Sequence, residues 1–94
     1  MNDAKLKILF GSACRIKVLR HYFENPYGGF YIRELTTILK EHMNNVRREL
    51  IKLEKLGILK KVEKGRLNYF YLKECDLAHD LAKVFGYNST PNQK

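Results

Sequence analysis

The residues best suited to recognition chemistry lie between positions 44 and 55, where amide and basic side chains recur at helical spacing. With about 100° between successive residues, Val46, Leu50, Leu53 and Leu56 fall on one side of a helix and predict its buried face. Asparagine can pair with adenine, arginine with guanine, and an exposed isoleucine can touch a thymine methyl group. The other positions are candidates for reading bases or, in the case of the later lysines, for binding phosphate: Asn44, Asn45, Arg47, Arg48, Ile51, Lys52 and Lys55. An ordinary solvated helix face is the alternative.

A second basic cluster surrounds Gly65. Its members are Lys60, Lys61, Lys64 and Arg66. A narrow hairpin with this charge can approach a phosphate backbone or a minor groove, so Lys64 and Arg66 are further candidates for binding nucleic acid. Edge strands also carry lysine simply to block aggregation, and Glu63 could pair with Arg66 across the turn.

Other groups of residues give weaker evidence for a functional site. Cys75 and His79 are spaced i, i+4, but one such pair leaves a tetrahedral metal site half filled. Five tyrosines invite comparison with base-stacking surfaces, although packing is the commoner use of such rings: Tyr22, Tyr27, Tyr31, Tyr69 and Tyr71. No nucleophile elbow, phosphate-binding glycine loop or metalloprotease motif is present. We therefore expect no enzyme, no catalytic residues, no cofactor and no metal site.

These side chains need a small set of elements to position them. Apolar spacing and the Pro and Gly residues predict the first helix at 12–25, a strand at 30–32, a short helix at 33–40 and a third helix from about Asn44 to Gly57. A last helix begins at Glu74 or Asp76 and ends at Gly86. The fold class expected is α+β and mainly helical, with a small three-stranded antiparallel sheet and a C-terminal helix.

The basic hairpin has a predicted register. The runs 58–63 and 67–72 are strand-like and flank Lys64-Gly65, which fits a two-residue turn. The expected opposing pairs are Leu59 with Phe70 and Glu63 with Arg66.

Composition sets the broad class. The 94 residues fit one domain, and 18 Lys plus Arg against 10 Asp plus Glu give a net charge of +8. This surplus makes a polyanion the leading candidate partner. The sequence has neither a run of apolar residues long enough to cross a membrane nor a secretion signal, and its two cysteines are expected to be reduced packing residues. We expect a cytoplasmic location and no membrane partner.

Two short helices followed by a basic hairpin form the outline of a winged helix-turn-helix domain. Over about residues 9 to 86, the sequence resembles the arsenic-repressor-like (ArsR-type) family of prokaryotic regulators. The resemblance rests on Leu9-Phe10-Gly11-Ser12, Phe30-Tyr31-Ile32-Arg33-Glu34-Leu35, Val46-Arg47-Arg48-Glu49-Leu50, Leu53-Glu54-Lys55-Leu56-Gly57-Ile58-Leu59 and Lys64-Gly65-Arg66.

This resemblance implies a regulator that binds double-stranded DNA, usually as a dimer, with its third helix in the major groove and its wing on the backbone or minor groove. The family usually has a glycine and a small cap between the two motif helices, whereas this chain has Lys40-Glu41-His42-Met43. We therefore expect His42 or Asn44 as the cap, and Asn44 is the better choice because its side-chain oxygen can accept a backbone N–H. Residues 1–86 would form the DNA-binding domain with terminal dimerisation helices, and 87–94 a flexible tail. The alternatives are a module that binds RNA or single strands and a winged helix used only for protein contacts.

The first helix carries two apolar stripes, which is more than one core needs. We therefore expect a homodimer built from the first and last helices, with packing inside one chain as the alternative. The expected interface residues are Cys14, Val18, Tyr22, Leu77, Ala78, Leu81, Ala82 and Phe85. Nothing in the sequence indicates a small-molecule or metal effector.

Overall fold

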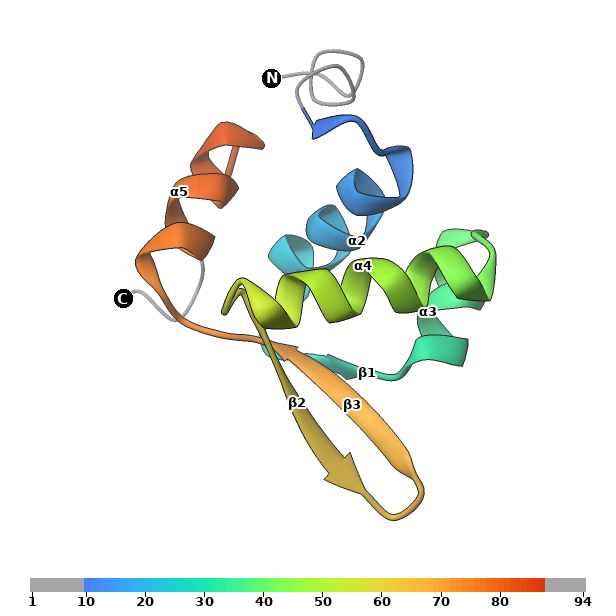
Figure 1. Cartoon of the computed structure of the whole chain (residues 1–94). Helices are drawn as coiled ribbons and strands as arrows, with labels where there is room; N and C mark the ends of the chain where they lie inside the picture. Colours follow the sequence, from blue (N-terminus) through green and yellow to red (C-terminus); the bar gives the residue numbers. More distant parts are fainter. Residues whose placement is uncertain (1–9, 88–94) are drawn as a thin grey trace.

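The computed structural model describes residues 10–87, and its elements follow in the predicted order (Figure 1). They are α2 (Ala13–Glu24), β1 (Gly29–Phe30), α3 (Ile32–Leu39), α4 (Met43–Lys55), β2 (Leu59–Lys64), β3 (Leu67–Leu72) and α5 (Asp76–Val84). The strands form one antiparallel sheet in the order β1-β3-β2. This confirms the expected α+β class. No helix within residues 10–87 is long and apolar enough to cross a membrane.

Helix α2 is the centre of the packing. Ser12 caps it, because the Ser12 hydroxyl accepts a hydrogen bond from the backbone N–H of Arg15 at 3.1 Å. Tyr22 is completely buried, and its hydroxyl donates to the carbonyl of Phe70 at 2.7 Å. Burial raises the pKa of Tyr22 well above its usual value, so this hydroxyl remains a donor. The bond fixes α2 to the central strand of the sheet.

Strand β1 is shorter than predicted. The chain leaves the sheet after Phe30, and Ile32 already belongs to α3, so the expected strand at 30–32 is wrong at its end. Tyr31 is the N-cap of α3 in extended backbone, and its N–H donates to the carboxylate of Glu34 at 3.4 Å. A glutamate three residues after the cap is half of a capping box, and here it starts the helix earlier than the apolar pattern indicated.

Helices α3 and α4 are joined by a tight turn without glycine. Lys40 ends α3 in the left-handed region, with φ of 55° and ψ of 48°. His42 is the N-cap of α4, and its side chain makes no capping bond. The preferred cap, Asn44, is therefore wrong: His42 occupies the cap position and α4 begins at Met43.

The hairpin differs from its predicted register by two residues. Lys64 pairs with Leu67, so the turn residues are Gly65 and Arg66, and the expected pairing of Glu63 with Arg66 is wrong. Gly65 has a φ of +64° and Arg66 does not have a positive φ, which is the pattern of a type II′ turn. Because side chains alternate between the two faces of a strand, a shift of two leaves every residue on its expected face. The corrected pairs are Leu59 with Leu72 and Glu63 with Asn68.

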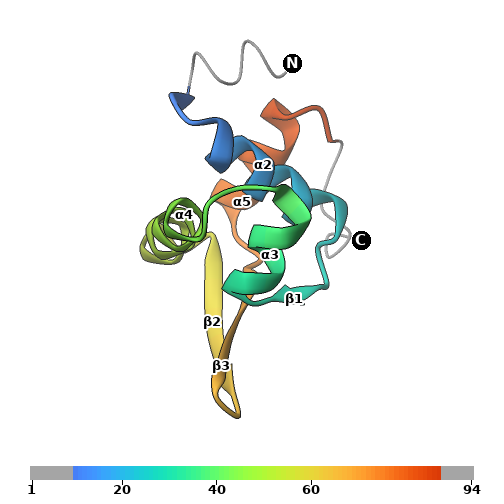
Figure 2. The ribbon, with the colours of Figure 1, turned by 90° about the vertical axis from the view of Figure 1, so that its right-hand side faces the viewer.

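Most residues of the predicted dimer interface are buried in the core of the single chain. Helix α5 lies beside α2 in both views (Figures 1 and 2), and the Phe85 ring meets Phe23 edge-on, with 5.5 Å between ring centres. The small side chains of α5 pack into this core of the same chain. The expected interface residues that are buried here are Cys14, Val18, Tyr22, Ala78, Ala82 and Phe85. Leu77 is exposed and Leu81 is half-buried.

The packed part of the chain extends to Tyr87, one residue beyond the predicted end of the domain at Gly86. Tyr87, expected in a flexible tail, is half-buried, and its hydroxyl donates to Glu24 at 2.7 Å. The tail expected at 88–94 and the lead-in at 1–9 lie outside the described residues.

Candidate nucleic-acid interface

Helix α4 separates a buried side from an exposed side, as its sequence predicts. Val46, Leu50 and Leu53 are buried in the core. Leu56 is 62% exposed, which contradicts its assignment to the buried face; at about 100° per residue it lies at the edge of the buried stripe, and it is the C-cap of the helix. Of the predicted recognition residues, Asn45 is half-buried and the others are exposed: Asn44, Arg47, Arg48, Ile51, Lys52 and Lys55.

Two hydrogen bonds orient the arginines of α4. Arg47 Nη1 donates to Asn44 Oδ1 at 3.0 Å, and Arg48 Nη2 donates to Asn45 Oδ1 at 3.2 Å. Arg47 faces a hollow on the side of the hairpin, whereas Arg48 lines a smaller hollow beside the start of α2. The two arginines therefore serve opposite flanks of the same exposed face.

An ion pair that the sequence reasoning missed ties α4 to α2. Glu49 is buried, and its Oε1 accepts a hydrogen bond from Arg15 Nε at 2.8 Å. Arg15 also donates to the carbonyl of Phe10 at 3.1 Å. The sequence did contain a sign of this ion pair, because Glu49 falls on the apolar side of the helix, where a buried carboxylate needs a basic partner.

A second ion pair holds the turn between α3 and α4. Lys17 Nζ lies 2.7 Å from Glu41 Oε2 and 3.4 Å from the carbonyl of Leu39. Helix α2 thus contacts both the turn and the body of the helix-turn-helix unit, so the exposed face of α4 is presented from a fixed support.

The hairpin is braced by a cation and a set of tyrosine rings. Lys64 Nζ donates to the Tyr71 hydroxyl at 2.6 Å and lies 5.4 Å from the centre of the Tyr69 ring. The hydrogen bond to Tyr71 raises the pKa of Lys64, which keeps this amine charged. Tyr69 also meets Tyr31 edge-on, with 5.4 Å between ring centres. Three of the five tyrosines weighed for base stacking are therefore in contact with one another or with Lys64.

The base of the hairpin depends on a glycine in β1. Gly29 pairs with Tyr71, and a Cβ at position 29 would overlap the Tyr71 ring. Only glycine lets the ring lie against the backbone here, so this close contact fixes where the hairpin leaves the sheet.

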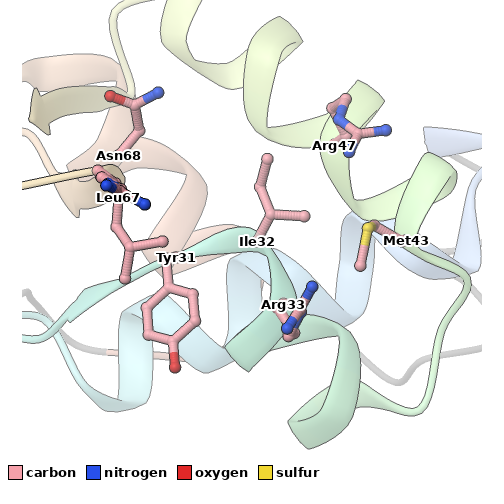
Figure 3. A pocket seen from close by; sticks show the side chains of 8 residues that line it. Tyr31, Ile32, Arg33, Met43, Arg47, Leu67 and Asn68 are labelled. Carbon is pink, nitrogen blue, oxygen red and sulfur yellow. The ribbon is translucent and has the colours of Figure 1, made fainter.

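A hollow of about 420 Å³ opens between the start of α3, the start of α4 and the hairpin turn (Figure 3). Arg33, Arg47 and Arg66 line it, one from each of these elements. The sequence reasoning included Arg47 and Arg66 but missed Arg33, because it considered only the third helix and the hairpin. The order of the elements already indicated Arg33. It lies in the first turn of the helix that follows β1, and β1 pairs with the hairpin strand β3.

The cysteines are placed for packing. Burial, together with the nearby Glu41 and Glu49, raises the pKa of Cys14 to about 11. Cys75 Sγ lies 3.5 Å from the carbonyl of Gly57, to which it donates. Within residues 10–87 no three His, Cys, Asp or Glu side chains lie together as a metal site would require.

Comparison with known proteins identifies the architecture. No protein-family model matches the sequence, and a search of curated proteins finds no match. Among solved structures, reduced HlyU from Vibrio cholerae matches with a TM-score of 0.62, over 86% of this chain and 85% of that chain, at 13% sequence identity. The chain has a winged-helix fold. Within this winged-helix domain, α3 and α4 are the helix-turn-helix pair, and β2 and β3 form the wing.

Proposed function

We propose that this winged-helix protein is a transcriptional regulator that binds double-stranded DNA in a sequence-specific manner as a homodimer. The observation that carries the proposal is that a hollow lined by Arg33, Arg47 and Arg66 lies between the exposed side of α4 and the wing, both of which carry further exposed basic residues. A net charge of +8 gives the whole chain the sign that a phosphate backbone attracts.

Helix α4 is the element proposed to enter the major groove. Asn44, Arg48 and Ile51 are exposed along its outer side and offer hydrogen-bonding and methyl-contacting groups to base edges. Lys52 and Lys55 follow near the C-terminal end and are suited to phosphate contacts. The wing, with Lys64 and Arg66, lies against the backbone or the minor groove of the same duplex.

The proposed dimer uses the outer face of α5 rather than the side that the core now covers. Leu77, Leu81 and Val84 are spaced i, i+4, i+7 and share that face, and Leu77 is 43% exposed. Leu81 also lines an apolar groove of about 400 Å³ together with Phe10 and Leu56. A two-fold contact there would cover exposed leucine on both copies and present two α4 helices to half-sites about one DNA turn apart.

Two alternatives are less well supported. Binding of single strands or RNA would use exposed aromatic rings, but Tyr69 and Tyr71 are already in contact with Lys64. A winged helix used only for protein contacts would not account for the exposed basic residues that gather on α4 and the wing.

The decisive experiment is a mobility-shift titration with the intact chain against duplex DNA, single-stranded DNA and RNA of matched length. We expect tightest binding to duplex DNA, and a preferred sequence after selection from a random pool. Tighter binding to single strands or RNA would overturn the proposal, as would an absence of binding to all three.

A further inference from the structure

The hollow beside the wing collects positive charge from three separate elements. Arg33 comes from the first turn of α3 and Arg47 from α4 (Figure 3). Arg66 comes from the wing turn, and all three arginines are exposed. Like charges that converge on one concave surface raise the local positive potential and attract an anion. The fold, rather than any one segment of sequence, creates this concentration.

None of these arginines is neutralised by an acid in the described part of the chain. Arg15 and Lys17 form ion pairs with Glu49 and Glu41, which lie on other sides of α4 and its turn. Glu34 neighbours Arg33 in sequence, but its carboxylate accepts the backbone N–H of Tyr31. The arginines therefore remain available to an external anion, and their planar forked groups suit phosphate oxygens.

The lining of the hollow also fits the rest of a nucleotide backbone. Ile32, Met43 and Leu67 contribute apolar surface against which a deoxyribose can pack, and Tyr31 and Asn68 contribute side chains able to donate hydrogen bonds to phosphate. A site for a free small anion would not need this apolar surface.

The position of the hollow indicates which part of a duplex would fill it. It lies between α4, which is proposed to enter the major groove, and the wing, which is proposed to reach the minor groove. The sugar-phosphate backbone of one strand separates those two grooves. We infer that Arg33, Arg47 and Arg66 form a clamp that holds neighbouring phosphates of this strand, with Arg33 as a DNA-binding residue outside the recognition helix and the wing. This inference rests on the proposed function.

The test measures how DNA affinity depends on salt for the full chain and for Arg33→Gln, Arg47→Gln and Arg66→Gln, singly and together. Removing one arginine from its phosphate should lower the slope of log K against log salt concentration by about 0.9 per bound protomer, and the triple variant should lower it by about three times as much. Affinity for the preferred duplex and for random duplex should fall by the same factor. Lys83→Gln, which removes an equal charge from the exposed side of α5, is the control and should leave the slope unchanged.

A second measurement alters the DNA and compares the wild-type chain with the triple variant. Neutral methylphosphonates replace two or three neighbouring phosphates of one strand, scanned along the preferred duplex. One position should weaken binding by the wild-type chain and have little effect on the triple variant. Equal losses for both proteins at every position would overturn the clamp.

The outcomes separate this inference from the proposed function. If wild-type protein fails to bind duplex DNA, both are wrong. If it binds with a sequence preference but Arg33→Gln keeps the wild-type slope, the clamp is wrong and the proposed function stands. If Arg33→Gln weakens the preferred duplex more than random duplex, Arg33 reads a base and the clamp is again wrong.

Discussion

At the scale of single residues, the two arginines of α4 divide the proposed work between them. Arg47 faces the hollow beside the wing, whereas Arg48 is held by Asn45 on the other flank, clear of the clamp. We therefore assign the proposed base contact to Arg48 and the proposed backbone contact to Arg47. Their effects on sequence preference should differ accordingly.

Arg48→Ala should cost about 1–3 kcal/mol on the preferred duplex and reduce the preference for it, because alanine cannot make the bidentate hydrogen bonds to guanine. Lys55→Ala is the control, since its proposed phosphate partner is present in every sequence and affinity should fall equally on all of them. Competition binding with preferred and random duplexes measures both variants. An equal loss on the two duplexes after Arg48→Ala would contradict the assignment.

The ion pair between Arg15 and Glu49 should matter more to stability than the pair between Lys17 and Glu41. The Glu49 side chain is only 8% exposed, so Glu49→Ala leaves the partly buried Arg15 without its acceptor and should lower the free energy of unfolding by about 2 kcal/mol. Lys17 is 46% exposed, and Lys17→Ala should cost less than about 1 kcal/mol. Urea unfolding compares the two, and similar losses would refute the ranking.

His21 should make the fold sensitive to mild acid. Burial lowers the pKa of His21 below its ordinary value of 6.5, and the described residues offer its Nε2 no hydrogen-bond partner. Between the lowered pKa and 6.5 the unfolded chain binds a proton more readily than the folded one, so stability is full above this window and falls as the pH drops through it.

The measurement is urea unfolding at pH 7.5 and at pH 5.5. Wild-type protein should lose more stability between these values than His21→Gln, while the exposed His42→Gln variant should behave as wild type. If His21→Gln retains the full pH dependence, another group is responsible.

At the scale of elements, the turn between α3 and α4 carries backbone strain. Lys40 adopts a left-handed conformation that costs a non-glycine residue about 1–2 kcal/mol, whereas glycine adopts it freely at the expense of a more flexible unfolded chain. Lys40→Gly should therefore raise the free energy of unfolding by up to about 1 kcal/mol. Lys40→Ala removes the same charge, keeps the strain and is the control. A glycine variant no more stable than the alanine variant would show that the turn is unstrained.

The elements also show how far sequence reasoning extends. The exposed face of α4 was predictable because one helical period fixes which side chains are buried together. Strand ends and the wing turn were not, because Glu34 starts α3 early and a shift of two residues in the hairpin preserves both faces. Arg33 was missed because only the third helix and the hairpin were considered, although the order of elements already places the start of α3 next to a strand that pairs with β3. Ala78 and Ala82 permit close packing of either a partner or the same chain, and in this structure it is the same chain.

At the scale of the whole molecule, the proposed dimer follows from what the core leaves uncovered. Leu77→Glu and Val84→Glu place a charge on the outer face of α5, where both residues are exposed, and should shift the chain toward its monomer mass of 11.1 kDa in sedimentation equilibrium. Lys83→Glu changes the charge on another side of the same helix and should leave the dimer intact. A wild-type chain that sediments as a monomer at micromolar concentration would remove the dimer from the proposal.

The bracing of the wing has a consequence for the thermodynamics of binding. Lys64, Tyr69, Tyr71 and Gly29 already hold the hairpin in one arrangement, so a partner meets a surface whose conformational entropy was given up when the chain folded. Weakening the contacts among these four residues would not change which groups touch the DNA. It would still reduce the affinity, because the hairpin would then lose conformational entropy on binding. The tyrosines of the wing would in that way contribute to recognition without touching what is recognised.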